Sequence, residues 1–359
     1  MKKLGAKIIG IVIIVFMMNH LFYRFFVQPN VDYTWGYDII HAKRDFLKSN
    51  NDQINTLFIG SSAMFRHIDP RVFDANINDS LGIHSFNFGI QAMFPLQSAY
   101  IYEHLLEKDS IQLKYAFMDL FEIGNMALAP NAVKKRTHYW YRWSDYKEAL
   151  KISSAYDSPL YVKWNAYFGY TIAYIAKLFN AEIIEEILLK QKSRAQNDFP
   201  FLQNDINGYY PLDQEYLDKK DESKEMEMRR NAFLKDTSMV TNAIISRRDF
   251  FRKYDADDYK INPLHLQKIN ELIALSEDKG IHLIFILHPR LFAYEYPLVM
   301  PLYDAIDDAH KLNLNDADKY HSFYEAKYTF DALHLNEAGA TIYSKALAEE
   351  FNQLLKNKP

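Results

Sequence analysis

The sequence predicts an α/β protein with a mostly parallel β-sheet, and three observations predict it. Short apolar runs typical of buried strands recur at 56–59, 82–92, 114–120 and 281–289. Helix-like segments separate them, as the crossovers between parallel strands require. The runs at 56–59 and 281–289 are almost unbroken, which is typical of strands that are covered on both faces. We therefore expect a three-layer sandwich.

The N-terminus predicts a membrane anchor. Three lysines lie within the first seven residues, and the apolar run IIGIVIIVFMM follows at 8–18. Counting on to Val27 gives the length of about 20 residues that a membrane-spanning helix needs. A cleaved signal peptide and a buried helix of a soluble domain are the alternatives, but no small-x-small cleavage site follows the run. The lysines favour a cytoplasmic N-terminus, so we expect a single-pass protein of the cytoplasmic membrane whose body, residues 28–359, is extracytoplasmic.

Composition excludes several classes of function. The formal net charge of −4 leaves no basic excess to neutralise phosphates, which argues against a general nucleic-acid binder. The chain has no cysteine, so a disulfide framework, a zinc–thiolate site and a cysteine nucleophile are all impossible.

The first strand ends in an unusual turn. A polar, aromatic connector at 28–53, with a helix expected near 37–48, leads into TLFI at 56–59 and then into Gly60-Ser61-Ser62. A glycine and two small hydroxyl residues allow a sharp strand-to-helix exit, which lifts one side chain clear of the sheet. A loop with an ordinary serine N-cap is the alternative.

The next elements continue the alternation. The second strand ends at Asn87-Phe88-Gly89, a helix at 95–108 begins at Pro95, and a third strand follows at 114–120. The pattern resumes with a helix at 262–280, for which Asn262 is the expected cap and Pro263 the first-turn residue. A buried strand at 281–289 and a last helix from Asn336 complete the domain.

Residues 125–261 interrupt this pattern and predict a large helical insertion. The segments 138–146 and 161–179 are aromatic and helix-like, while the charge run KKDESKEMEMRR at 219–230 is interpreted as a solvated surface. Loops at the carboxyl edge of a parallel sheet form ligand walls. We therefore expect some residues of one cluster to line the mouth of a pocket: Tyr139, Trp140, Arg142 and Trp143. Packing within the insertion and docking on a bilayer or a membrane partner are the alternatives.

The chemistry-bearing residues lie far apart in the sequence. A serine nucleophile needs a base, and the base needs a carboxylate to fix its tautomer. DALHLNEAGA supplies Asp331-x-x-His334 just before the last helix, and Ser62 follows the first strand. Taken singly, Asp331 is also compatible with an Asx turn and His334 with a polar helix entry.

Together these motifs resemble the SGNH/GDSL hydrolase superfamily over residues 54–124 and 262–355. The resemblance implies a flavodoxin-like three-layer fold, with Ser62 as nucleophile, His334 as base and Asp331 as its carboxylate. It also implies that the backbone N–H groups of Ser62 and Gly89 stabilise the oxyanion. The third family block, Gly-x-Asn-Asp, is missing: Glu122 stands near its place and Asn125 lies further along, so Asn87 is the expected substitute donor.

The GSS form, the anchor and the insertion resemble the membrane-anchored branch, which includes proteins of polysaccharide O-acetylation and of teichoic-acid D-alanylation. This implies a serine esterase or O-acyltransferase that uses an acyl donor and a cell-envelope glycan. The alternative is a degenerate domain that holds a glycan or assists a multi-span membrane acyltransferase.

We expect no cofactor and no metal ion. Arg66-His67-x-Asp69 lacks further ligands at a diagnostic spacing. His288 and Arg290, in LHPR at a strand end, are interpreted as loop residues, although both could face the site.

Overall fold

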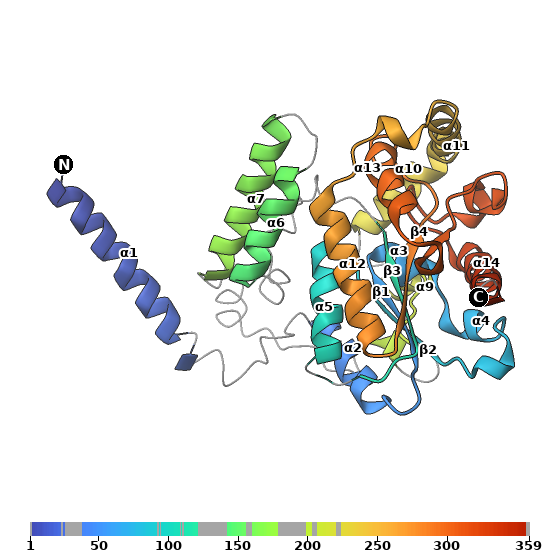
Figure 1. Ribbon diagram of the computed structural model, residues 1–359, viewed down its shortest axis with the longest axis horizontal. Coiled ribbons are helices and arrows are strands. Elements are labelled where there is room, and N and C mark those ends of the chain that lie inside the picture. The colour runs from blue at the N-terminus through green and yellow to red at the C-terminus, as the bar shows by residue number, and fades with distance from the viewer. Residues whose placement is uncertain are drawn as a thin grey trace. The chain divides into compact units, whose positions relative to one another are not determined.

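The chain forms two compact units (Figure 1). The computed structural model describes residues 2–22, 24–25, 38–91, 93, 95–107, 109, 111–120, 142–155, 160–178, 199–202, 207–219 and 224–356. The first unit comprises Met1–His41, Gly124–Ser154 and Ser158–Ala195, and the second comprises Ala42–Ile123, Ala155–Asp157 and Gln196–Pro359.

The second unit is built on a five-stranded sheet in which every paired strand is parallel. Its strands are β1 (Thr56–Gly60), β2 (Ser85–Gly89), β3 (Tyr115–Asp119), β4 (His282–Leu287) and β5 (Lys311–Asn313). Their order, β2-β1-β3-β4-β5, is that of flavodoxin-like doubly wound sheets. The prediction of an α/β fold with a parallel sheet is confirmed. Because the strands are parallel, their carboxyl ends meet at one edge.

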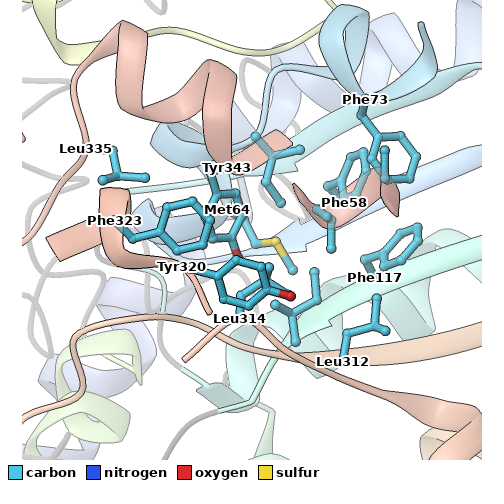
Figure 2. Packing of buried hydrophobic residues seen from close by; sticks show 14 of the residues in the cluster. Phe58, Met64, Phe73, Phe117, Leu312, Leu314, Tyr320, Phe323, Leu335 and Tyr343 are labelled. Carbon is cyan, nitrogen blue, oxygen red and sulfur yellow. The ribbon is translucent and has the colours of Figure 1, made fainter. Parts of the chain in front are cut away.

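One face of the sheet carries an extensive hydrophobic core. Alternate strand residues such as Phe58, Phe117 and Ile284 point to this face, where they belong to one cluster with residues of α14. The helices here are α3 (Ser62–His67), α4 (Pro70–Asp74) and α14 (Glu337–Lys356). The ring of Phe117 lies 4.9 Å from Phe58 and 5.1 Å from Phe351. Figure 2 shows Phe58, Phe73 and Phe117 in this packing, with Met64 beside them.

The other face is covered by α2 (Asp38–Ser49), α5 (Pro95–Glu107) and α12 (Pro263–Asp278). The Tyr102 hydroxyl of α5 lies 2.8 Å from Ser276 Oγ of α12, which joins the two helices above the sheet. As the sequence predicts, the Asn262 side chain caps α12 by accepting two backbone N–H groups, and Pro263 stands in its first turn. Helices on both faces make three layers.

Part of the predicted insertion belongs to the second unit. Residues from Gln196 onward lie in that unit, so the expected insertion of 125–261 is divided between the two units. Its helices here are α9 (Leu212–Asp218), α10 (Lys224–Lys235) and α11 (Ser238–Phe251). Phe233 and Val240 join the core cluster, which explains the division. Helix α13 (Tyr296–Ala305) and six short 3-10 turns complete the described part of this unit: Asp79–Leu81, Pro200–Leu202, Ala256–Asp258, Asp308–His310, His321–Tyr324 and Ala326–Tyr328.

The first unit contains α1 (Lys2–Phe22), α6 (Trp143–Ala155) and α7 (Leu160–Leu178). Tyr146 joins α6 to α7, because its hydroxyl lies 2.9 Å from Thr171 Oγ1 and its ring stacks on Tyr174. The segment 3–22 of α1 is long and apolar enough to cross a membrane. Membrane anchors and signal sequences both have this property.

Candidate active site

The predicted strand-to-helix exit is present where β1 meets α3. Ser61 is the N-cap, and its hydroxyl accepts the Ala63 N–H at 3.2 Å. A Cβ atom at Gly60 would lie 1.7 Å from Asp119 Oδ1, so only glycine lets the end of β3 approach so closely. Ser62 is the first helical residue, and its backbone N–H has no intrahelical acceptor.

Asp119, the last residue of β3, supports this turn. Its Oδ2 accepts the Ser61 N–H at 2.8 Å, and its side chain is 1% exposed. Asp119 is not among the site residues predicted from the sequence. The available signal was a carboxylate that ends an otherwise apolar strand, at the edge where Ser62 was expected.

The structure brings Ser62, His334 and Asp331 together in one hydrogen-bonded row. Ser62 Oγ lies 2.9 Å from His334 Nε2, although the two residues are 272 positions apart. His334 Nδ1 lies 2.9 Å from Asp331 Oδ1, which also accepts the backbone N–H groups of Leu333 and His334. An ionised carboxylate is acceptor-only, so it assigns the ring proton to Nδ1 and leaves Nε2 to accept from the Ser62 hydroxyl.

The surroundings of Asp331 keep it ionised. Burial alone would raise the pKa of this carboxyl, but the hydrogen bond and charge of His334, the Leu333 N–H and the charge of Arg229 outweigh burial and lower it to about 2. Arg229 Nη1 lies 3.8 Å from Asp331 Oδ2. Asp331 is therefore a carboxylate throughout the neutral range.

Arg229 belongs to the charge run that is predicted to be solvated surface. Its described residues, 224–230, lie in α10 and are mostly exposed, as predicted, but its last two arginines also contact the segment that carries Asp331. Arg230 donates to the Phe330 carbonyl at 2.6 Å, and its guanidinium lies 4.6 Å from the centre of the Phe330 ring. Helix α10 thus contacts the segment that carries Asp331.

The predicted oxyanion roles of Asn87 and Gly89 do not fit their contacts. The Asn87 amide donates to the Met64 and Ile68 carbonyls at 2.8 and 2.7 Å, and its Oδ1 accepts the Gly89 N–H at 2.8 Å. Asn87 instead joins β2 to the end of α3. Position 89 requires glycine for a steric reason, because a Cβ atom there would lie 2.3 Å from Phe65 N. Of the three predicted donors, the Ser62 N–H remains.

A buried lysine holds the end of β2. Lys43 Nζ donates to the carbonyls of Asn87, Gly89 and Gly208 at 2.8, 2.8 and 2.9 Å. Burial, together with the charge of Arg66, lowers the pKa of this amine well below its usual value. Lys43 lies in the predicted connector, and nothing in its local sequence distinguishes it from a surface lysine.

Arg66, His67 and Asp69 are engaged in protein contacts. Arg66 pairs with Glu215 and donates to the Tyr210 carbonyl at 2.8 Å. Asp69 caps α4 and pairs with Arg71. His67 Nε2 accepts the Leu335 N–H at 3.2 Å, which ties α3 to the segment just after His334.

His288 and Arg290 follow β4 at the same edge of the sheet. His288 Nδ1 lies 2.7 Å from the Tyr343 hydroxyl, and its Nε2 lies 3.6 Å from Asp119 Oδ1. Arg290 has a left-handed backbone, with φ of 62°, and its Nη1 donates to Thr329 Oγ1 at 3.4 Å. Both residues thus contact segments that carry site residues.

Two of the predicted pocket-mouth residues lie outside the described residues, and the other two belong to the first unit. Tyr139 and Trp140 lie outside the described residues, as do Glu122 and Asn125. Arg142 and Trp143 belong to the first unit, whereas Ser62, Asp331 and His334 belong to the second. Their role in substrate binding stays a prediction. Arg142 pairs with Asp145, and Trp143 packs 5.6 Å from Tyr174.

Comparison with known proteins adds no relative: no family model matches the chain, and no curated protein sequence is significantly similar to it.

Proposed function

We propose that the protein is a serine-dependent acyl esterase or O-acyltransferase. One observation carries the proposal: Ser62 Oγ, His334 Nε2 and Asp331 form a continuous hydrogen-bonded row with both links at 2.9 Å. This is the arrangement that activates a serine for attack on an acyl carbon.

The chemistry follows from the roles that these contacts allow. Ser62 Oγ attacks the acyl carbonyl of the donor while His334 Nε2 takes the hydroxyl proton. Asp331 stabilises the imidazolium, and the Ser62 N–H donates to the oxyanion. When the tetrahedral intermediate collapses, the bond to the leaving alcohol breaks and His334 returns its proton to that alcohol. Water or a glycan hydroxyl then attacks the acyl-serine with His334 as base, which regenerates Ser62.

The SGNH-like resemblance and α1 support the biological setting. In this proposal the protein is held in the cytoplasmic membrane by α1, and its SGNH-like domain acts outside the cytoplasm on a cell-envelope polysaccharide. A multi-span membrane acyltransferase would supply the acyl group if transfer is the reaction. The chain lacks the family's Gly-x-Asn-Asp block, but Ser62, Asp331 and His334 do not belong to that block.

A second candidate is a non-catalytic SGNH-like protein that holds a glycan or assists a membrane acyltransferase. The engaged Asn87 amide and Gly89 N–H favour it, because they leave the predicted oxyanion site with fewer donors.

Covalent labelling separates the two candidates. A fluorophosphonate probe should form an adduct on Ser62 of the full-length protein, identified by peptide mass spectrometry. Ser62→Ala should abolish the adduct. Ser61→Ala is the matched control, because it retains the nucleophile and removes only the N-cap hydroxyl. If folded wild-type protein gives no adduct on Ser62, the esterase proposal is wrong and the non-catalytic candidate is favoured.

A further inference from the structure

Helix α7 carries an exposed apolar stripe. Its members are 37–71% exposed and include two aromatic rings that are 64% exposed: Leu160, Tyr161, Trp164, Phe168, Ile175 and Leu178. At about 100° per residue they fall within an arc of about 100° on one side of the helix. The stripe runs the length of α7, about 27 Å at 1.5 Å per residue.

The opposite side of α7 is used for folding. Ala166, Tyr170 and Ala173 are buried there. Tyr146 of α6 contacts Thr171 and Tyr174, which lie near one edge of the stripe. The contact with α6 thus reaches one edge of the stripe and leaves its six members exposed. An exposed apolar surface of this length is unusual unless something covers it.

A contact with α1 indicates what covers the stripe. Asn19, near the end of α1, donates from Nδ2 to the carbonyl of Leu178 at 2.9 Å. This bond joins the last residue of α7 to the polar end of the helix that could span a membrane. If α1 crosses the bilayer, the end of α7 lies at the membrane surface.

We propose that α7 lies along the outer surface of the membrane, with its apolar stripe buried at the boundary between headgroups and acyl chains. This inference rests on the proposed anchoring by α1. Tyr161 and Trp164 suit this depth, since Trp and Tyr rings favour the membrane interface. Among the described helices only α1 is apolar enough to span, because α7 also carries Lys163, Asn165 and Lys177. An amphipathic helix of this kind lies on a membrane rather than across it.

Tryptophan quenching by brominated lipids tests the depth. The chain has four tryptophans, so Trp35, Trp140 and Trp143 are replaced by Phe to leave Trp164 as the only emitter. The full-length variant is reconstituted in phosphatidylcholine vesicles brominated either high or low in the acyl chain. We expect the shallow bromines to quench about half of the Trp164 emission and the deep ones less. The proposal would be overturned if aqueous iodide quenches Trp164 and neither brominated lipid does. It would also be overturned if none of these reagents quenches Trp164, because the ring would then be buried in the protein.

A release assay tests the docking itself. A protease site is inserted at residue 30, the reconstituted protein is cleaved, and the released body is separated from vesicles by flotation. We expect the wild-type body to stay with the vesicles and the Trp164→Glu/Phe168→Glu double variant to bind at least about tenfold more weakly. Trp143→Glu is the matched control, because Trp143 is 55% exposed on α6 and lies outside the stripe.

The two proposals can fail separately. Fluorophosphonate labelling of Ser62 is measured on the same double variant and should match wild type, which shows that the second unit is folded. The docking proposal is overturned if the wild-type body and the double-variant body both stay on the vesicles, or if both are released. This holds whether or not Ser62 is labelled. Loss of Ser62 labelling in wild type overturns the proposed chemistry and leaves the flotation result unchanged.

Discussion

Asp331 is the residue whose ionisation should be visible in both activity and stability. Its folded-state pKa of about 2 lies below the usual value of 3.8, so the folded state binds the proton less tightly than the unfolded state. The carboxylate therefore contributes stability above about pH 4, and this contribution is lost as the pH falls through about 2. The shift corresponds to about 2 kcal/mol in the free energy of unfolding.

We predict that Asp331→Asn removes this part of the pH dependence, measured by urea unfolding between pH 7 and about pH 2. At neutral pH the same variant should slow fluorophosphonate labelling of Ser62 on the order of 10³-fold, because an amide does not hold His334 in the required tautomer. An unchanged labelling rate would show that Asp331 plays no part in activating Ser62.

Asp119 gives a second prediction at the residue scale, because it accepts the Ser61 N–H beside the nucleophile. Asp119→Ala leaves that partly buried N–H without its acceptor and frees the turn, so labelling of Ser62 should slow about 10- to 100-fold. Asp119→Asn keeps an acceptor oxygen and should recover most of the rate. Equal rates for the two variants, with circular dichroism showing both folded, would contradict a positioning role.

At the scale of elements, Lys43 joins three segments through the carbonyls of Asn87, Gly89 and Gly208. Lys43→Met would leave these acceptors buried without a donor, at about 1–3 kcal/mol each. We predict a loss of at least about 3 kcal/mol in the free energy of unfolding, measured by urea denaturation. Lys48→Met is the control on the same helix: Lys48 pairs with Asp109 but is 43% exposed, so its loss should cost about 1 kcal/mol or less. Similar losses for both variants would show that the three contacts are not the source of stability.

The elements also show why sequence predicts some features and not others. The strands β1 to β4 and the helices α5, α7, α12 and α14 carry enough apolar residues in a regular pattern to be predicted. Strand β5 has three residues, of which Leu312 alone is buried, so no periodicity reveals it. The contacts of α10 could not be predicted, because its sequence shows only a run of charges and its contacts with the Asp331 segment exist only in the folded chain.

The same distinction applies within the site. Ser62, Asp331 and His334 could be predicted because a nucleophile, a carboxylate and a base follow in that order along the chain and carry recognisable neighbours. The structural role of Asn87 could not be predicted from the sequence, because it depends on the Met64 and Ile68 carbonyls that accept its amide N–H groups in the folded chain. Lys43 acts through backbone carbonyls of distant segments, and an isolated Lys in a sequence carries no mark of such partners. Asp119 offered one signal, a carboxylate at the end of an apolar strand, but its contact with the Ser61 N–H exists only in the folded chain.

At the scale of the whole molecule, orientation in the membrane decides which substrates the site can meet. Lys2, Lys3 and Lys7 precede the apolar helix and Arg24 follows it, so the excess of positive charge lies on the N-terminal side. Since positively charged flanks stay in the cytoplasm, residues 28–359 should be exported. A reporter enzyme that is active only outside the cytoplasm, fused after residue 30, should be active. Replacing the three lysines by Glu leaves Arg24 as the dominant flanking charge and should reduce that activity while raising the activity of a cytoplasmic reporter at the same position. Wild-type fusions that are active only with the cytoplasmic reporter would place the Ser62 row inside the cell, where a cell-envelope glycan is not its substrate.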